Sequence, residues 1–198
     1  YALACAGLYR LARVWLSVSM SLVALAFFAL NPGVLYMATT AMTEPLFLAE
    51  MVWAILLAVL LDRALRESAA GEAVQTSPGK LLLDAGVVLA AAVLTRYDGW
   101  ILAAVVWLFI TLRLAFNKAE WKPLRRAWMV FTTLIVAPCA LWLIYNAAIF
   151  GDPLDFMRGP YSARAIEART TPRGGFFHPG WHSMHVAALY FLKSAELG

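Results

Sequence analysis

The sequence predicts an all-α fold: a polytopic transmembrane helix bundle of about five membrane helices, followed by an external amphipathic helix. Hydrophobic residues make up 63% of its 198 residues, charged residues only 14%, and the mean hydropathy is +0.73. A soluble domain carries about 25% charged residues. The apolar residues also form long blocks. These observations indicate an integral membrane protein, in which the net charge of +4 is a topology signal rather than a sign of nucleic-acid binding.

Five apolar blocks predict the membrane helices, at about residues 14–30, 43–63, 80–95, 99–116 and 127–149. A shorter block at 1–9 is interpreted as the tail of an earlier span, so we expect a fragment of a longer protein. The apolar part of the third helix is only about 21 Å long, which leaves a re-entrant hairpin over 81–116 as an alternative. Residues 1–150 thus form the membrane part. Residues 151–198 are predicted to be an external loop with an interfacial helix at about 181–197.

The basic residues favour one orientation of the chain. With Arg10 and Arg13 in the cytoplasm, the loops at 62–80 and 117–126 are also cytoplasmic and hold most of the Lys and Arg between helices. The loops at 31–44 and 95–99 are then external. The unusual polar residues at helix ends and turns all fall on that external side: Glu44, Arg96, Asp98, Asp152, Asp155 and Arg158.

Glu44 precedes Pro45 at the external start of the second predicted helix. One interpretation is structural, because Thr43 can cap the helix, proline suits its first turn and an acid favours the helix dipole there. The functional interpretation is a carboxylate on a rigid helix end that contacts a substrate or a metal. Glu50 lies about 9 Å deeper, where an ionisable group is a functional candidate unless it faces a polar bundle interior.

The densest polar stretch is LTRYDGW, residues 94–100, between two apolar helices. In a structural interpretation Asp98 caps a helix, Gly99 makes the turn, and Arg96 and Trp100 anchor the interface. This leaves Arg96 unexplained, because it is the one basic residue of the two external loops. Since the planar donor fork of arginine matches phosphate and carboxylate, Arg96 is predicted to pair with one of them.

The tail adds candidates for a substrate groove, which together with Glu50 are Asp152, Arg158, Tyr161 and His178. Asp152 is most simply explained as a turn residue, and a solvated loop explains Arg158 and Tyr161 equally well. His182 and His185 have the i, i+3 spacing of a zinc site on a helix, but no third ligand has a suitable spacing. We therefore predict no metal site there.

Several common chemistries lack their motifs: the sequence has no Walker motif, no GxGxxG, no serine nucleophile elbow and no HExxH. Cys5 and Cys139 stand far apart within apolar blocks. They are predicted to be small buried hydrophobic residues rather than a disulfide or metal ligands.

The runs ALNPGVLYMATTAMTEPLFL, LTRYDGW and NAAIFGDPLDF, in this order and spacing, resemble the GT-C superfamily of membrane glycosyltransferases. The bacterial branch related to protein O-mannosyltransferases and aminoarabinose transferases is most similar, over roughly residues 1–160. The resemblance implies a sugar donor linked to polyprenyl phosphate. It implies inverting transfer to a protein, lipid or glycan acceptor at the external, periplasmic face of the bacterial cytoplasmic membrane.

The same resemblance implies roles for individual residues. The family's acid at the external start of a membrane helix matches Glu44, and its basic and acidic turn matches Arg96 and Asp98. Glu44 and Asp98 are then catalytic, while Arg96 and Tyr97 bind the donor phosphate. The motifs identify no cofactor, and a divalent metal stays an open alternative. The family's principal catalytic acid, in its first external loop, has no match here and is expected upstream of Tyr1.

Two other classes of function stay open. A fragment of a transporter or flippase would use charged helix ends, a broken hairpin at 81–116 and buried charges near the membrane midplane, for which Glu50 is the candidate. In a non-catalytic membrane scaffold, the same motifs would serve only as caps and anchors.

Overall fold

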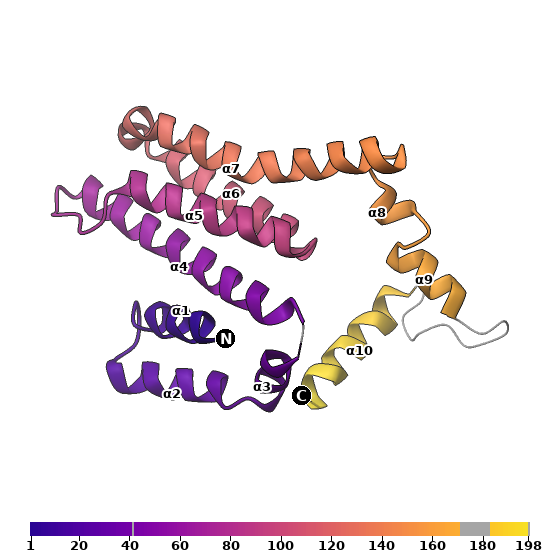
Figure 1. Cartoon of the computed structure of the whole chain (residues 1–198). Helices are drawn as coiled ribbons and strands as arrows, with labels where there is room; N and C mark the ends of the chain where they lie inside the picture. The colour runs from indigo at the N-terminus through magenta and orange to yellow at the C-terminus, as the bar shows by residue number, and fades with distance from the viewer. Residues whose placement is uncertain (41, 171–182, 198) are drawn as a thin grey trace. The chain divides into compact units, whose positions relative to one another are not determined.

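The computed structural model describes residues 1–40, 42–170 and 183–197, without the side chains of 118–120, 163–164 and 195–197. It confirms the predicted fold class, because the described residues form helices and no strand. The chain divides into two compact units, Tyr1–Leu141 and Trp142–Gly198. Figure 1 labels the helices of both units.

Four helices of the described chain are long and apolar enough to cross a membrane. They are α4 (Glu44–Ala69), α5 (Pro78–Thr95), α6 (Asp98–Phe116) and residues Trp121–Phe150 of α7 (Lys118–Phe150). A fifth span is available if α2 (Val18–Ala29) and α3 (Pro32–Thr39), which meet at a 58° bend, cross together. These apolar helices mark the chain as an integral membrane protein and agree with the five spans that the sequence predicts.

The first part of the chain differs from the prediction in its helix ends. Residues 2–12 form a helix of their own, α1 (Ala2–Ala12). The next helix begins at Val18 rather than at 14, because the Ser17 side chain accepts a hydrogen bond from the Met20 N–H and caps it. The predicted loop at 31–44 contains α3, since Asn31 caps a new helix with Pro32 in its first turn.

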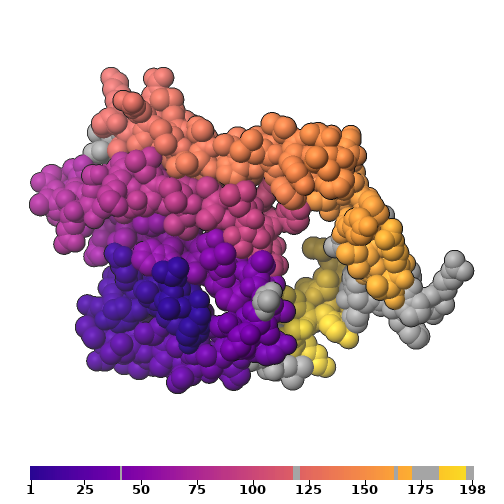
Figure 2. Space-filling model, in the orientation of Figure 1, coloured from indigo at the N-terminus to yellow at the C-terminus, as the bar shows by residue number. Residues whose placement is uncertain are grey.

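The helices α4, α5 and α6 pack side by side with alternating directions, as Figure 1 shows. Ser77 caps α5, which has 18 residues and a length of about 27 Å. That length approaches the bilayer's apolar thickness of about 30 Å, so a re-entrant hairpin is not needed to explain the short apolar block at 81–94. On the other flank, α1 packs against α4, and Figure 2 shows their indigo and purple surfaces in contact.

The core of the first unit lies between α4, α5, α6 and α7. Its fully buried large side chains include Leu56, Leu61, Leu82, Leu89, Ile110, Leu114 and Phe131. Two reciprocal hydrogen bonds join α6 to α7, from Trp107 Nε1 to Thr132 Oγ1 and from Trp128 Nε1 to Thr111 Oγ1, each 3.0 Å long. The last membrane helix begins at Lys118 rather than at the predicted residue 127. The charged residues between these two positions are good helix formers, so the helix extends beyond the apolar block.

The described residues of the second unit form the end of α7 and the helices α8 (Asp155–Arg158), α9 (Ala163–Thr170) and α10 (Met184–Leu197). The predicted interfacial helix at 181–197 corresponds to α10, which exposes Met184, Phe191 and Leu192. Much of the predicted external loop is helical instead, in α8 and α9. Gly151, with φ of +75°, makes the turn after α7.

Candidate functional site

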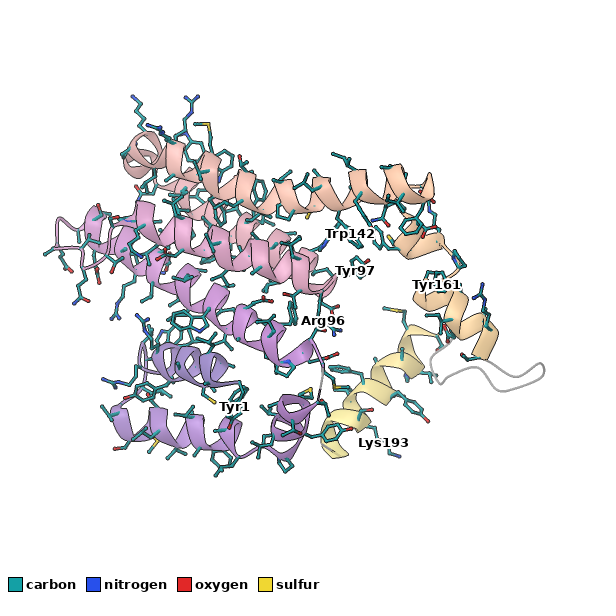
Figure 3. The ribbon with its side chains drawn as sticks, in the orientation of Figure 1. Tyr1, Arg96, Tyr97, Trp142, Tyr161 and Lys193 are labelled. Carbon is teal, nitrogen blue, oxygen red and sulfur yellow. The ribbon has the colours of Figure 1, made fainter. Side chains whose placement is uncertain are left out.

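Two motifs that are far apart in the sequence meet at one end of the first unit. The Arg96 guanidinium donates from Nη1 to Glu44 Oε1 at 2.5 Å and from Nε to Asp98 Oδ2 at 3.0 Å. Nη1 also donates to Thr43 Oγ1 at 3.2 Å. Thr43, Glu44, Arg96 and Asp98 are called the Arg96 cluster below. Figure 3 labels Arg96 at the turn where α5 ends.

The backbone at the end of α5 directs Arg96 toward α4. Arg96 is the C-cap of α5, and its extended conformation (φ −151°, ψ 154°) turns the chain out of the helix. The next helix starts two residues later, at Asp98. Because α4 and α5 run in opposite directions, this turn lies beside the first turn of α4. The sequence separation of 52 residues between Glu44 and Arg96 is closed in this way.

Gly99 permits this close return of the chain. A Cβ atom on Gly99 would lie 2.0 Å from the Ala92 carbonyl oxygen and 2.4 Å from its carbon, both backbone atoms of α5. The sequence pattern predicts that Gly99 makes the turn. Among the described glycines, however, Gly71 and Gly151 have positive φ angles and Gly99 does not. The role of Gly99 is therefore steric. Gly99 therefore fixes the distance between α5 and the α6 residue Asp98.

Thr43 stands at the cap position that the structural interpretation gives it, whereas Asp98 does not. Thr43 is the N-cap residue of α4, but its side chain makes no capping hydrogen bond. Asp98 stands in the first turn of α6, behind the N-cap Tyr97. Both side chains bond to Arg96 instead, because the guanidinium is a stronger, charged donor than a backbone N–H.

The Arg96 cluster holds two carboxylates around one cation, a formal charge of −1. The side chains of Arg96, Glu44 and Asp98 are 31%, 37% and 60% exposed, so water and solutes reach the site. The hydrogen bond to Asp98 raises the pKa of Arg96 above its ordinary value; partial burial opposes this effect, and Glu44 adds to it. Arg96 is thus a permanent cation whose Nε and Nη1 already donate to the other members of the cluster.

Glu50 lies on α4 beyond the cluster, with only 8% of its surface exposed. Its Oε1 accepts a hydrogen bond from Thr95 Oγ1 at 2.8 Å, and the same hydroxyl lies 2.9 Å from the Ala91 carbonyl oxygen. Glu50 Oε2 is buried without a hydrogen-bond partner in the described structure. Since buried polar atoms are nearly always paired, this oxygen is a candidate contact for a polar ligand.

Tyr97, predicted to contact the donor phosphate, is half exposed beside Arg96 (Figure 3). Its ring meets that of Trp100 edge-on, with centroids 6.2 Å apart. The Trp100 Nε1 donates to the Val93 carbonyl oxygen at 3.2 Å, which fixes the pair on the end of α5. Two aromatic rings at the mouth of a helix bundle are typical of the membrane interface.

The remaining predicted residues do not belong to the first unit. The Asp152 Oδ1 accepts from the Leu154 N–H at 2.9 Å, so its predicted role as a turn residue is confirmed. Arg158 ends α8, and Tyr161 is 83% exposed. His178 and His182 lie outside the described residues. Within the described residues, no group of three or more His, Cys, Asp or Glu side chains is placed to hold a metal ion.

A second polar cluster, at the opposite end of α4, was not predicted as a site. Asp62 accepts from Arg66 at 2.8 Å and from Arg113 on α6. In the sequence, these residues are recognised only as the charged ends of apolar blocks. The structure thus brings Glu44, Arg96 and Asp98 to one end of the bundle and Asp62 to the other. Which end faces the cell exterior stays a prediction.

Comparison of the chain with protein-family models, curated proteins and solved structures finds no match. The GT-C resemblance therefore rests on the sequence motifs alone.

Proposed function

We propose that this chain is part of a membrane glycosyltransferase that moves a sugar from a polyprenyl-phosphate donor to a protein, lipid or glycan acceptor. One observation carries the proposal: Arg96 is held between Glu44 and Asp98, which come from the two motifs that the resemblance marks as functional. The cluster stands at the end of apolar helices, where the phosphate of a membrane-embedded donor lies. We further propose that this end faces the exterior of a bacterial cytoplasmic membrane.

In the proposed reaction, the acceptor oxygen bonds to the anomeric carbon while the bond from that carbon to the phosphate oxygen breaks. The acceptor proton passes to a carboxylate, and the departing phosphate takes up the negative charge. Arg96 stabilises this phosphate through its remaining donors. Asp98, more exposed than Glu44, is the partner that gives way to the phosphate, while Glu44 keeps Arg96 in place and faces the acceptor.

The family's principal catalytic acid has no counterpart in these residues, so the test uses the complete protein. Purified protein is reconstituted in liposomes with polyprenyl-phosphate sugars, and release of polyprenyl phosphate is measured. We expect Arg96→Ala to lower turnover at least about 100-fold, the loss typical of a removed charge-stabilising group. Arg125→Ala, which removes an exposed cation of α7, is the matched control and keeps wild-type turnover.

Wild-type turnover in the Arg96→Ala variant removes Arg96 from the site. A purely structural role for the cluster predicts instead that Arg96→Ala lowers turnover and thermal stability together. Adding Glu44→Gln to that variant would then restore neither quantity. The proposed role predicts that the single variant Glu44→Gln stays folded and binds the donor but transfers the sugar more slowly.

A transporter is the second candidate function. Two observations favour it: the broken helix pair α2–α3 with its 58° bend, and the buried Glu50 with an unpaired oxygen in the described structure. Discontinuous helices and buried carboxylates form the binding sites of many transporters. In the liposome assay, a transporter moves the lipid-linked sugar across the bilayer without releasing polyprenyl phosphate.

A further inference from the structure

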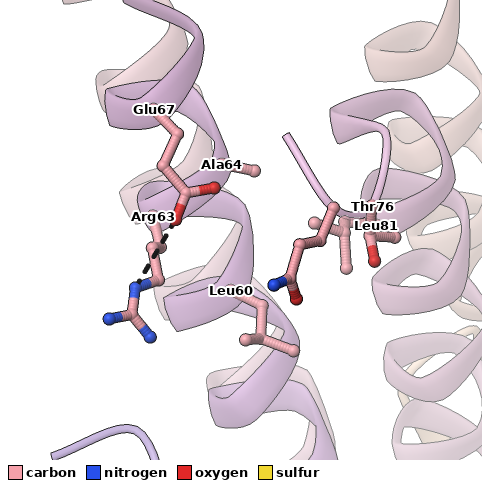
Figure 4. Close-up of a pocket in the computed structure, with 7 residues that line it drawn as sticks. Leu60, Arg63, Ala64, Glu67, Thr76 and Leu81 are labelled. Carbon is pink, nitrogen blue, oxygen red and sulfur yellow. Dashed lines mark ion pairs between the residues drawn. The ribbon is translucent and has the colours of Figure 1, made fainter. Parts of the chain in front are cut away.

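A groove opens at the Asp62 end of the first unit, away from the Arg96 cluster. It has a volume of about 430 Å³ and lies between α1, α4, α5 and the loop before α5. A neighbouring hollow of about 290 Å³, shown in Figure 4, shares Leu60, Gln75, Thr76 and Leu81 with it. We call the surface lined by Arg10, Trp53, Leu57, Thr76, Lys80 and Asp84 the basic groove.

The lining of the basic groove changes from apolar to polar along its length. Trp53, Leu57 and Leu60 follow one another at i, i+4 and i+7 on α4, so they line one face over about 10 Å. The polar residues Gln75 and Thr76 of the exposed loop line the same groove. An apolar strip that leads to a polar mouth fits an amphiphile better than a soluble ion.

Two cations from helices far apart in the sequence line the groove. Arg10 of α1 lies 5.3 Å above the Trp53 ring, and no carboxylate lies within ion-pair distance of it in the described structure. Lys80 of α5 pairs with Asp84 at 2.6 Å, but its side chain is 65% exposed and keeps room for another partner. Arg10, Lys80 and Asp84 together leave a charge of +1, which favours an anionic ligand.

We propose that the basic groove binds an anionic phospholipid of the surrounding leaflet. Its phosphate lies between Arg10 and Lys80, its glycerol and headgroup hydroxyls face Gln75 and Thr76, and the start of one acyl chain lies along Trp53 and Leu57. Basic pockets between membrane helices bind anionic headgroups in this way. The inference is independent of the proposed transferase function, because it concerns the opposite end of the helices.

The test is native mass spectrometry of the complete protein, released from mixed phosphatidylglycerol and phosphatidylcholine nanodiscs. We expect wild-type protein to retain phosphatidylglycerol in preference to phosphatidylcholine. The Arg10→Gln/Lys80→Gln variant is expected to lose this preference, by about fivefold for each cation removed. The control Lys122→Gln/Arg125→Gln removes two exposed cations of α7 and keeps the preference.

Two further variants separate lipid binding from folding. Arg10→Lys/Lys80→Arg keeps both charges and is expected to keep the preference, whereas Thr76→Trp blocks the exposed mouth without a change in charge and is expected to lose it. A wild-type protein without preference overturns the proposal. So does an Arg10→Gln/Lys80→Gln variant that retains phosphatidylglycerol like the wild type.

Discussion

Arg96 shows how a residue's neighbours change its predicted chemistry. Its position as the one basic residue of two predicted external loops identifies it as unusual, and arginine is suited to phosphate. In the structure, two carboxylates already occupy Nε and Nη1. In the proposed reaction Asp98 gives way to the donor phosphate, while Glu44 stays bonded to Arg96 and faces the acceptor.

Glu50 poses a different question at the residue scale, because its burial is compatible with a structural or a functional role. We expect Glu50→Leu to leave the thermal stability unchanged or raised, since Thr95 keeps the Ala91 carbonyl as its acceptor and replacing a buried charge by an apolar side chain is often neutral or stabilising. Sugar transfer is expected to fall about tenfold, the effect of one lost hydrogen bond to a substrate. Thermal unfolding and the liposome assay measure the two effects.

Thr95→Val is the matched control for Glu50→Leu. It removes the hydroxyl and leaves the Glu50 carboxylate buried without its partner, so it is expected to lower stability. If Glu50→Leu lowers stability while transfer is unchanged, Glu50 is a structural tie between α4 and α5 and has no contact with substrate.

At the scale of the elements, the apolar blocks locate every span but place several ends wrongly. Helix ends depend on single capping residues, as Ser17 and Asn31 show, and on polar residues that continue a helix beyond the bilayer, as at Lys118. A hydropathy pattern reports where a helix is buried in lipid. It does not report where the hydrogen-bonded helix stops.

The close contact between α5 and α6 at Gly99 can be tested by substitution. In Gly99→Ala, the new Cβ meets backbone atoms of α5, which have no rotamer to change, so the variant is expected to lose about 1–3 kcal/mol of stability and to disturb Arg96. Gly79→Ala is the control, because its Cβ would lie 3.9 Å from its nearest neighbours. Thermal unfolding in detergent measures the stability of both variants. Equal stability of the two variants contradicts the close packing of α5 and α6.

At the scale of the whole molecule, the proposed function requires that the Arg96 cluster faces the exterior of the cell. The orientation predicted from the basic residues puts Tyr97 outside and Glu72 inside. In a Cys5→Ala/Cys139→Ala background, we expect Tyr97→Cys to react with a membrane-impermeant maleimide applied to intact cells. Glu72→Cys, in the exposed loop between α4 and α5, is expected to react only after the membrane is opened. Labelling of both positions from the same side refutes the predicted topology.

The sequence by itself determines the membrane class, the approximate spans and the alternation of their ends. These properties follow from the length of apolar blocks relative to the bilayer, and they already place Glu44, Arg96 and Asp98 at the same end. Only the tertiary structure decides that Arg96 is held by both acids, that Gly99 acts through steric contact and that Arg10 and Lys80 share a groove. Such contacts depend on how each helix is rotated and how closely it approaches its neighbour. Packing between distant segments sets both quantities, and no local pattern records them.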